Sequence, residues 1–258
     1  MAMLLALDAG NTNVTIGVFE GAALQTSWRL RTVRDQTADE WGVQLRSLFR
    51  EADIDPRVIH GVAISSVVPP IDQPLADAAR RYFAAEPVFV SVERDLGIEV
   101  RIDNPREAGA DRLANAVAAF HKYGGPCAVV DFGTAINFDI TSREGHFLGG
   151  IICPGIGIAI SGLFEKAARL PLVDFRAPRR LIGTNTVDCI QSGLYYSTIG
   201  AIDGILERLY AEIGGDLKVV ATGGQARLIT QGSRYLKIVD DELTLDGVRL
   251  IWERHGQR

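Results

Sequence analysis

At 258 residues the chain is long enough for one large domain or two modest ones, and its 47% hydrophobic and 23% charged residues suit a soluble globular protein. The net charge of −5 argues against a nucleic-acid binder, which would show a basic surface. No apolar run reaches the length of a membrane span, and the first residues lack the basic start of a signal peptide. We therefore expect a cytoplasmic protein with neither a nucleic acid nor a membrane as partner.

The cysteines and histidines show no spacing typical of a metal site. Cys127, Cys153 and Cys189 are odd in number, widely spaced and set among apolar neighbours. This pattern indicates buried thiols in a reducing compartment rather than disulfides or zinc ligands. The histidines are equally scattered, so we interpret them as ordinary surface or core residues.

The first part of the chain predicts strands alternating with helices. A helix should begin at Thr37, because Thr37 and Glu40 form a T-x-x-E capping box. Trp41, Leu45, Leu48 and Ala52 follow at helical spacing and predict its core face. Strands are expected over 4–7, 14–19, 24–30, 58–68 and 87–92, and a second helix over 74–84.

The second part repeats this order of elements. A helix from Asp111 to about Tyr123 leads into "CAVVDFGTAINFDI", residues 127–140, which reads as two strands around a Gly-Thr turn. A third strand is expected around 147–153, helices over 157–169 and 186–213, and a further strand over 218–224.

The opening stretch "LLALDAGNTNVTIGV" has two interpretations. By itself it suggests a tight hairpin, because Gly and Asn both tolerate positive φ. However, Asp8 and Gly10 match Asp131 and Gly133 in the second part, each pair followed by Thr and a resumed strand. A plain turn has no reason to recur in this way, so we expect a duplicated βββαβα unit. Two such loops facing each other would suit the phosphates of a nucleotide and its Mg²⁺.

Phosphoryl transfer from ATP needs positioning and charge neutralisation more than covalent catalysis. Asp8 is a suitable Mg²⁺ partner through water, since Mg²⁺ needs only one or two carboxylates. No G-x-x-x-x-G-K-[ST] motif occurs, which excludes a P-loop enzyme. "ATGGQA", residues 221–226, follows a strand and opens a helix, so it is either an adenosine contact or an ordinary turn.

A third motif, "DNPREAGADRLANAVAAF", spans residues 103–120. Asp111 stands at the start of an apolar helix, where a carboxylate is often only a cap or a partner of the helix dipole. It also falls where the two halves of the chain meet, and a positioned Asp can accept a hydroxyl proton. Arg112 could then bind an acceptor carboxylate in bidentate fashion. The duplicated loops need an acceptor site, which favours the functional interpretation.

"DAGNTN", "NPREAGADR", "VVDFGTA", "NT…QSG" and "ATGGQA", in this order, closely resemble the type III pantothenate kinase family. The resemblance extends from Leu4 to about Glu253. It implies the α/β fold of the actin, hexokinase and sugar-kinase superfamily, with two ribonuclease H-like domains around a central cleft. We place these domains at residues 1–116 and 117–258. It also implies ATP-dependent phosphorylation of pantothenate to 4′-phosphopantothenate, the first step of coenzyme A biosynthesis, by a homodimer whose surface includes helix 186–213.

The same resemblance implies roles for individual residues. Asp111 would be the general base, and Asp131 would bind a monovalent cation, potassium or ammonium. ATP with Mg²⁺ would be held by the first phosphate loop, by a threonine of the second and by the glycines of the adenosine motif: Asp8, Ala9, Gly10, Asn11, Thr12, Asn13, Val14, Thr15, Thr134, Gly223 and Gly224. Pantothenate would lie against Ile102, Gly109, Ala110, Asp111, Arg112 and Thr186.

Four positions, in three motifs, depart from the family pattern. Ile102 stands where the family often has Tyr, Ile136 and Asn137 replace two threonines of the second loop, and Thr184 replaces a lysine. None of them is one of the proposed catalytic or metal-binding carboxylates, so we expect an active enzyme. The alternatives are a non-catalytic, ATP-binding regulator of the same family and another small-molecule kinase of the superfamily.

Overall fold

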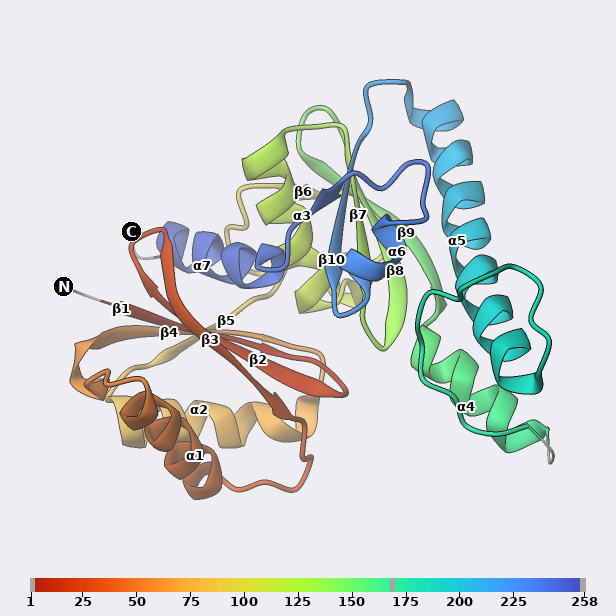
Figure 1. The fold of residues 1–258 in the computed structure, drawn as a ribbon. Helices are drawn as coiled ribbons and strands as arrows, with labels where there is room; N and C mark the ends of the chain where they lie inside the picture. The colour runs from red at the N-terminus through yellow and green to blue at the C-terminus, as the bar shows by residue number, and fades with distance from the viewer. Residues whose placement is uncertain (1–2, 168–169, 256–258) are drawn as a thin grey trace. The chain divides into compact units, whose positions relative to one another are not determined.

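The computed structural model describes residues 3–167 and 170–255, which group into two compact units (Figure 1). The first unit contains the chain up to Ala118 and again from Glu242 onward, and the second contains Ala119–Asp241. The strands are β1 Met3–Ala9, β2 Asn13–Glu20, β3 Ala23–Arg31, β4 Ile59–Ser66, β5 Pro87–Phe89, β6 Glu99–Val100, β7 Cys127–Phe132, β8 Ala135–Thr141, β9 His146–Pro154, β10 Lys218–Gly223 and β11 Ile238–Val239. The helices are α1 Ala38–Glu51, η1 Pro56–Val58, α2 Pro69–Phe83, η2 Pro105–Glu107, α3 Ala110–Tyr123, α4 Ile156–Lys166, α5 Thr186–Ile213, α6 Ala226–Thr230 and α7 Leu243–His255.

The first unit is built on a sheet with the strand order β3-β2-β1-β4-β5. β1, β2 and β3 form an antiparallel meander, whereas β1 and β4, and then β4 and β5, pair in parallel. Parallel pairing places the carboxyl ends of β1 and β4 at one edge of the sheet. There Asp8 is in register with Ser65, and Ala9 with Ser66.

Helices cover both faces of this sheet. α1 and α2 pack together on one face, with Trp41, Phe49 and Ile71 fully buried against β1, β2 and β4 (Figure 1). α7 packs against β1, β2 and β4 from the other face. Leu4 to Leu7 are consequently all buried, which explains why the first strand reads as a continuous apolar run rather than an alternating one.

The second unit repeats the topology with its strands in the order β11-β10-β7-β8-β9. β7, β8 and β9 form the antiparallel meander, and β7, β10 and β11 are parallel. The core of this unit lies between the sheet and α5, which contributes Tyr195, Ile199, Ile202 and Leu206. The duplicated α/β unit predicted from the sequence is thus confirmed.

The boundaries of the units differ from the expected division at residues 116 and 117. The chain passes from the first unit to the second within α3, after Ala118, and returns at Glu242, so that α7 belongs to the first unit. The reason is packing. The Cβ positions at Gly17 on β2 and Gly61 on β4 lie within 2.9 Å of Leu245 and 2.3 Å of Trp252, respectively, so α7 sits directly on these glycines.

The predicted start of α1 is confirmed in atomic detail. Glu40 donates its backbone N–H to Thr37 Oγ1 at 3.3 Å, and Thr37 donates its own to Glu40 Oε2 at 2.7 Å. The expected core face needs one change, since Ala52 is exposed at the C-cap and Phe49 is buried in its place.

Three other expectations were wrong in part. The second helix begins at Pro69 rather than Pro74, because prolines fit the first turn, where a helix needs no backbone N–H donor. The strand expected over 87–92 ends at Phe89. Of the cysteines, Cys127 is buried, Cys153 is half-buried and Cys189 is exposed, so only the first fits the expectation of a buried thiol.

The described segments, 3–167 and 170–255, contain no helix long and apolar enough to cross a membrane.

Candidate active site

The loop predicted to hold phosphate is a hairpin between β1 and β2. Gly10 donates its backbone N–H to the Asn13 carbonyl at 3.0 Å, which closes the turn. Thr32, just after β3, donates its N–H to the Thr12 carbonyl at 3.0 Å and its Oγ1–H to the Gly10 carbonyl at 2.6 Å. The hairpin interpretation is therefore correct for the local structure. It is compatible with a binding role, because the side chains of Asn11, Thr12 and Asn13 are exposed.

Asp8 lies one residue before the end of β1 and is half-buried. It pairs with Thr15 across the hairpin and with Ser65 on β4. Ser65 Oγ donates to Asp8 Oδ1 at 2.9 Å. Ala9 and Val14 are fully buried beneath the loop, so they serve as its base rather than as ligand-facing groups.

Asp111 stands in the first turn of α3. Its Oδ1 accepts the backbone N–H of Arg112 at 2.8 Å. Burial raises the pKa of the Asp111 carboxyl, an effect that the Arg112 N–H and guanidinium oppose. A carboxylate with a raised pKa is a better proton acceptor than an exposed aspartate, which suits a general base.

Asp111 and the first loop are connected through the end of β4. Val67 donates its N–H to the Ala9 carbonyl at 3.1 Å. The Cβ position at Gly109 lies 3.4 Å from Val67 Cγ1 and 2.6 Å from Asp111 Oδ1. Gly109 therefore lets the start of α3 approach the edge where β1 and β4 end. Ile102 is half-buried in the same unit, after β6, and Ala110 is buried in the first turn of α3.

The second unit brings Asp131, Gly223 and Gly224 together at the matching edge of its sheet. Asp131, near the end of β7, is in register with Thr222 on β10. Gly223 has φ +88°, and its Cβ position lies 2.6 Å from Asp131 Oδ1 and 2.7 Å from the Phe132 carbonyl oxygen. Gly224 donates its N–H to that carbonyl at 3.2 Å. Thr134 is exposed in the loop between β7 and β8.

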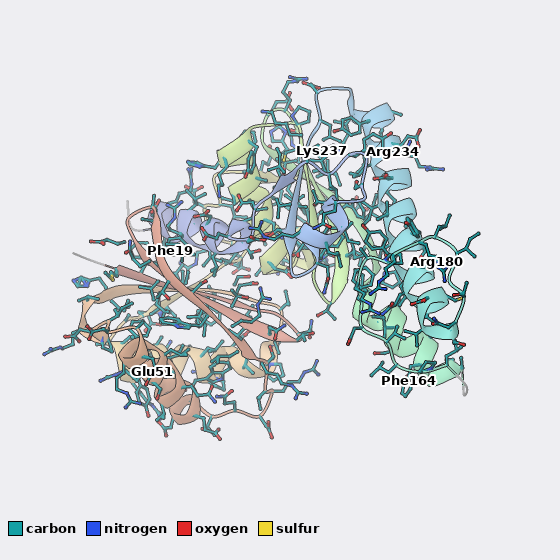
Figure 2. All side chains as sticks on the ribbon, viewed as in Figure 1. Phe19, Glu51, Phe164, Arg180, Arg234 and Lys237 are labelled. Carbon is teal, nitrogen blue, oxygen red and sulfur yellow. The ribbon has the colours of Figure 1, made fainter. Side chains whose placement is uncertain are left out.

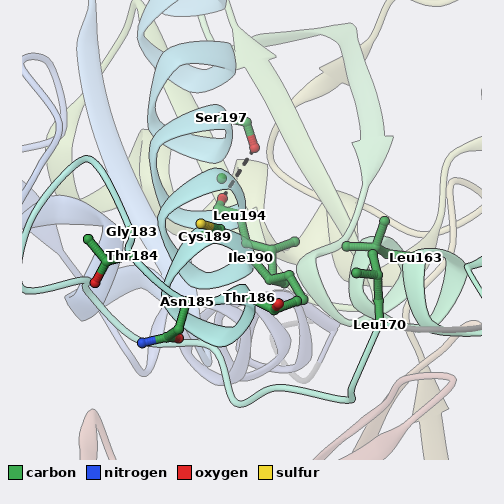
Figure 3. Close-up of a pocket in the computed structure, with 11 residues that line it drawn as sticks. Leu163, Leu170, Gly183, Thr184, Asn185, Thr186, Cys189, Ile190, Leu194 and Ser197 are labelled. Carbon is green, nitrogen blue, oxygen red and sulfur yellow. Dashed lines mark hydrogen bonds between the residues drawn. The ribbon is translucent and has the colours of Figure 1, made fainter.

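Thr186 lines a pocket of about 670 Å³ in the second unit (Figure 3). It is the first residue of α5, whose N-cap Asn185 accepts the Asp188 N–H through Oδ1 at 2.9 Å. The pocket has an apolar side formed by α4, the segment after it and α5, and a polar side that includes Thr184. The residues that line it are Leu163, Leu170, Gly183, Thr184, Asn185, Thr186, Cys189, Ile190, Gly193, Leu194 and Ser197.

The sequence patterns did not predict that Ser65, Val67 and Thr32 lie beside the candidate site residues. Residues 58–68 had been interpreted only as a buried strand, although a pair of serines interrupts its apolar run. That interruption was the available signal. Once β4 pairs in parallel with β1, a serine at this end of the strand must lie beside Asp8.

Comparison with known proteins gives a consistent result. A family model described as type III pantothenate kinase matches residues 4–208. The chain is 62% identical to the type III pantothenate kinase of Solibacter usitatus, covering 98% of this chain and 97% of the relative. The enzyme of the same name from Koribacter versatilis is 54% identical, with 98% and 96% covered.

Solved structures share the fold at low identity. A protein from Campylobacter jejuni described as a Baf family transcriptional activator superposes with a TM-score of 0.59 and 19% identity, covering 98% of this chain and all of the other. A protein described as an N-acetylglucosamine kinase from Porphyromonas gingivalis gives a TM-score of 0.52 and 13% identity, covering 99% and 100%. At these identities the likeness concerns the fold alone.

Gly223→Ala should destabilise the protein by about 2–4 kcal/mol, because overpacking and a positive φ both oppose a side chain there. The added Cβ would meet the Phe132 backbone N and O at 2.7 Å, and neither atom can rotate away. Urea unfolding measures the loss. Gly215→Ala is the matched control, since no atom lies within 4 Å of its Cβ position. Equal stability of the two variants would contradict the close packing of Gly223 on β7.

Proposed function

This chain belongs to the type III pantothenate kinase family, and we propose that it transfers the γ-phosphoryl group of ATP to pantothenate with the residues that close the carboxyl edges of its two sheets. As a pantothenate kinase it carries out the first step of coenzyme A biosynthesis. The observation that supports the residue assignment best is the link through Val67, which holds the partly buried carboxyl of Asp111 near the strand end that carries Asp8.

We assign the phosphates of ATP to the loop from Asp8 to Thr15 and to Thr134, and the adenosine to Gly223 and Gly224. The exposed Asn11, Thr12 and Asn13 offer polar side chains around the Gly10 turn. Within residues 3–167 and 170–255, no three His, Cys, Asp or Glu side chains cluster as a metal site. We assign Mg²⁺ to the Asp8 carboxylate through water, because Mg²⁺ keeps several waters and needs only one or two carboxylates. When bound, Mg²⁺ neutralises charge on the phosphates.

Asp111 is assigned as the general base. Its carboxylate would accept the proton of the attacking pantothenate hydroxyl, and its position in the first turn of α3 fixes it relative to Gly109 and Arg112. Arg112 is assigned to the pantothenate carboxylate, which a guanidinium binds in bidentate fashion. Thr186 is assigned to the same substrate because the start of α5 offers backbone N–H groups to an anion.

We assign the monovalent cation, potassium or ammonium, to Asp131. Gly223 lets the backbone of β10 lie close to the Asp131 carboxylate and the Phe132 carbonyl, since a Cβ there would stand only 2.6 Å and 2.7 Å from these two oxygens. Oxygen ligands of this kind suit a hard cation. The cation would supply a fixed positive charge beside the second phosphate loop.

The first experiment measures ADP release with MgATP, with and without pantothenate, in potassium and in sodium buffer. We expect turnover that requires pantothenate and falls at least about tenfold in sodium, a loss of about 1.4 kcal/mol in transition-state stabilisation. In the Asp131→Asn variant, the turnover rates in potassium and in sodium buffer should differ by less than about twofold. Turnover with a sugar but not with pantothenate would indicate another kinase, and ATP binding without turnover would indicate the regulator.

Asp111→Asn should lower kcat by about 10²–10⁴-fold, the range for loss of a general base, while the affinity for nucleotide stays within about twofold. Steady-state kinetics and calorimetric titration with an ATP analogue measure the two quantities. Asp103→Asn, at an exposed position on the loop before η2, is the control and should keep wild-type kcat. If Asp111→Asn kept its kcat as well, Asp111 would be only a helix cap.

The same substitution has a predicted effect on stability. Because burial raises the pKa of Asp111 in the folded chain, ionisation costs stability as the pH rises from about 3.8 through that raised pKa. The Asn variant is free of this cost, so its Tm should exceed that of the wild type at pH 7, and the difference should shrink as the pH falls toward 4. Thermal unfolding at several pH values measures it. The apparent pKa of the acid limb of the kcat/KM profile should lie above the ordinary pKa of an aspartate.

We also propose that the enzyme is a homodimer that uses a surface of the second unit. Large apolar side chains are exposed on β9, α4, the segment after α4 and α5; Figure 2 labels Phe164 near the end of α4. We propose that these side chains together form the association surface, since large exposed apolar patches typically mark one. These side chains are Ile152, Ile158, Leu163, Phe164, Leu172, Leu181, Ile182, Val187 and Tyr196.

Ile182→Asp should shift the sedimentation coefficient from dimer to monomer at micromolar concentration, since burying an unpaired charge in an interface is costly. Ile182 is 78% exposed, so the substitution leaves the fold of the unit intact. Val43→Asp is the control, at a position on α1 in the first unit that is 58% exposed. A variant that sediments like the wild type would rule out this surface.

A further inference from the structure

The carboxylate of Asp8 is held by a serine that the proposed mechanism does not use. Ser65 is fully buried on β4, directly beside Asp8 in the parallel register, and its Oγ donates to Asp8 Oδ1 at 2.9 Å. Burying a hydroxyl group next to an apolar core costs folding free energy unless the group makes a hydrogen bond. Its hydrogen bond to Asp8 therefore accounts for a polar side chain at this position.

The next serine points to a different partner. Ser66 Oγ donates to Asp72 Oδ1 at 2.5 Å and accepts the Val68 N–H at 3.1 Å, so it fixes the start of α2. Successive residues of a strand face opposite sides of the sheet, which separates the two hydroxyls. Ser66 thus provides a comparison: the same residue type, one position along the same strand, with no contact to Asp8.

The end of β4 holds the end of β1 at two points. Ser65 Oγ binds the Asp8 carboxylate, and the Val67 N–H binds the Ala9 carbonyl at 3.1 Å. Val67 also lies against Gly109, next to Asp111. One short segment therefore contacts both the side chain assigned to Mg²⁺ and the helix start that carries the assigned base.

We propose that Ser65 is a positioning residue for phosphoryl transfer, which sets the orientation of the Asp8 carboxylate toward Mg²⁺ and the nucleotide. The proposal rests on the function proposed above for Asp8. The terminal torsion of an aspartate is broad, so a carboxylate without a fixed donor samples many orientations. A buried hydrogen bond to one oxygen narrows that range and places the plane of the carboxylate before the ligand arrives.

The test measures Mn²⁺ as a substitute for Mg²⁺. Electron paramagnetic resonance follows free Mn²⁺ in titrations of the protein with a non-hydrolysable ATP analogue, for the wild type, Ser65→Ala, Ser66→Ala and Asp8→Asn. Loss of one hydrogen bond to a charged group predicts that Ser65→Ala weakens Mn²⁺ binding by about 10- to 150-fold. The Mg²⁺ concentration for half-maximal turnover should rise by a similar factor, while the KM for pantothenate stays unchanged.

Ser66→Ala should bind Mn²⁺ with wild-type affinity, and urea unfolding of both serine variants separates a stability effect from a positioning effect. The proposal is overturned if Ser65→Ala binds Mn²⁺ as the wild type does while Asp8→Asn does not. The proposal is also overturned if Ser65→Ala and Ser66→Ala weaken Mn²⁺ binding by the same factor. The effect would then reflect the packing of β4. If Asp8→Asn retains full Mn²⁺ binding, the metal role of Asp8 fails as well, and the two failures are thereby distinguished.

Discussion

The parallel pairing of β1 with β4, repeated by β7 with β10, is the constraint on which the candidate site depends. Each pair brings two carboxyl ends to one edge of a sheet, and each edge carries an aspartate one residue before the strand ends. Antiparallel pairing at the same positions would have placed these ends on opposite edges. The hairpins to β2 and β8 then present their loops beside the aspartates, so the topology itself assembles a polar edge on an apolar sheet.

The two edges use this arrangement differently. At Asp8 the neighbouring strand contributes a serine hydroxyl, which donates to the carboxylate. At Asp131 the neighbouring strand contributes Gly223, whose backbone lies so close to the carboxylate and to the Phe132 carbonyl that no side chain fits there. A hydroxyl donor orients a carboxylate, whereas a glycine lets the backbone of the next strand approach it closely. The duplicated unit therefore surrounds its two aspartates with different neighbours.

Asp111 illustrates the cost of such a site. Its carboxyl is partly desolvated, which raises its pKa and disfavours the ionised form that a general base requires. The Arg112 N–H offsets part of this cost, and Gly109 keeps the approach to the carboxyl free of a side chain. Proteins commonly accept lower stability at catalytic groups, because an optimally solvated carboxylate would be a weaker base.

The sequence by itself determined the order of elements, the repeat and most of the candidate site residues. Helix starts are local events, so the capping box at Thr37 could be located from residue types, and the Asp–Gly–Thr loops could be matched by spacing. The family resemblance, supported by a family model over residues 4–208, supplied the reaction. The predicted start of the second helix was wrong because both Pro69 and Pro74 could begin a helix, and the helix begins at Pro69.

Only the tertiary structure decided which residues lie beside the candidate groups. Ser65 and Asp8 are far apart in the sequence, and their contact exists because β1 and β4 are neighbours in register. The return of α7 to the first unit likewise depends on glycines of β2 and β4 that leave room for Leu245 and Trp252. Spacing along the chain carries information about one helix or one loop. Contacts between distant strands depend on packing of the whole sheet, which no local pattern encodes.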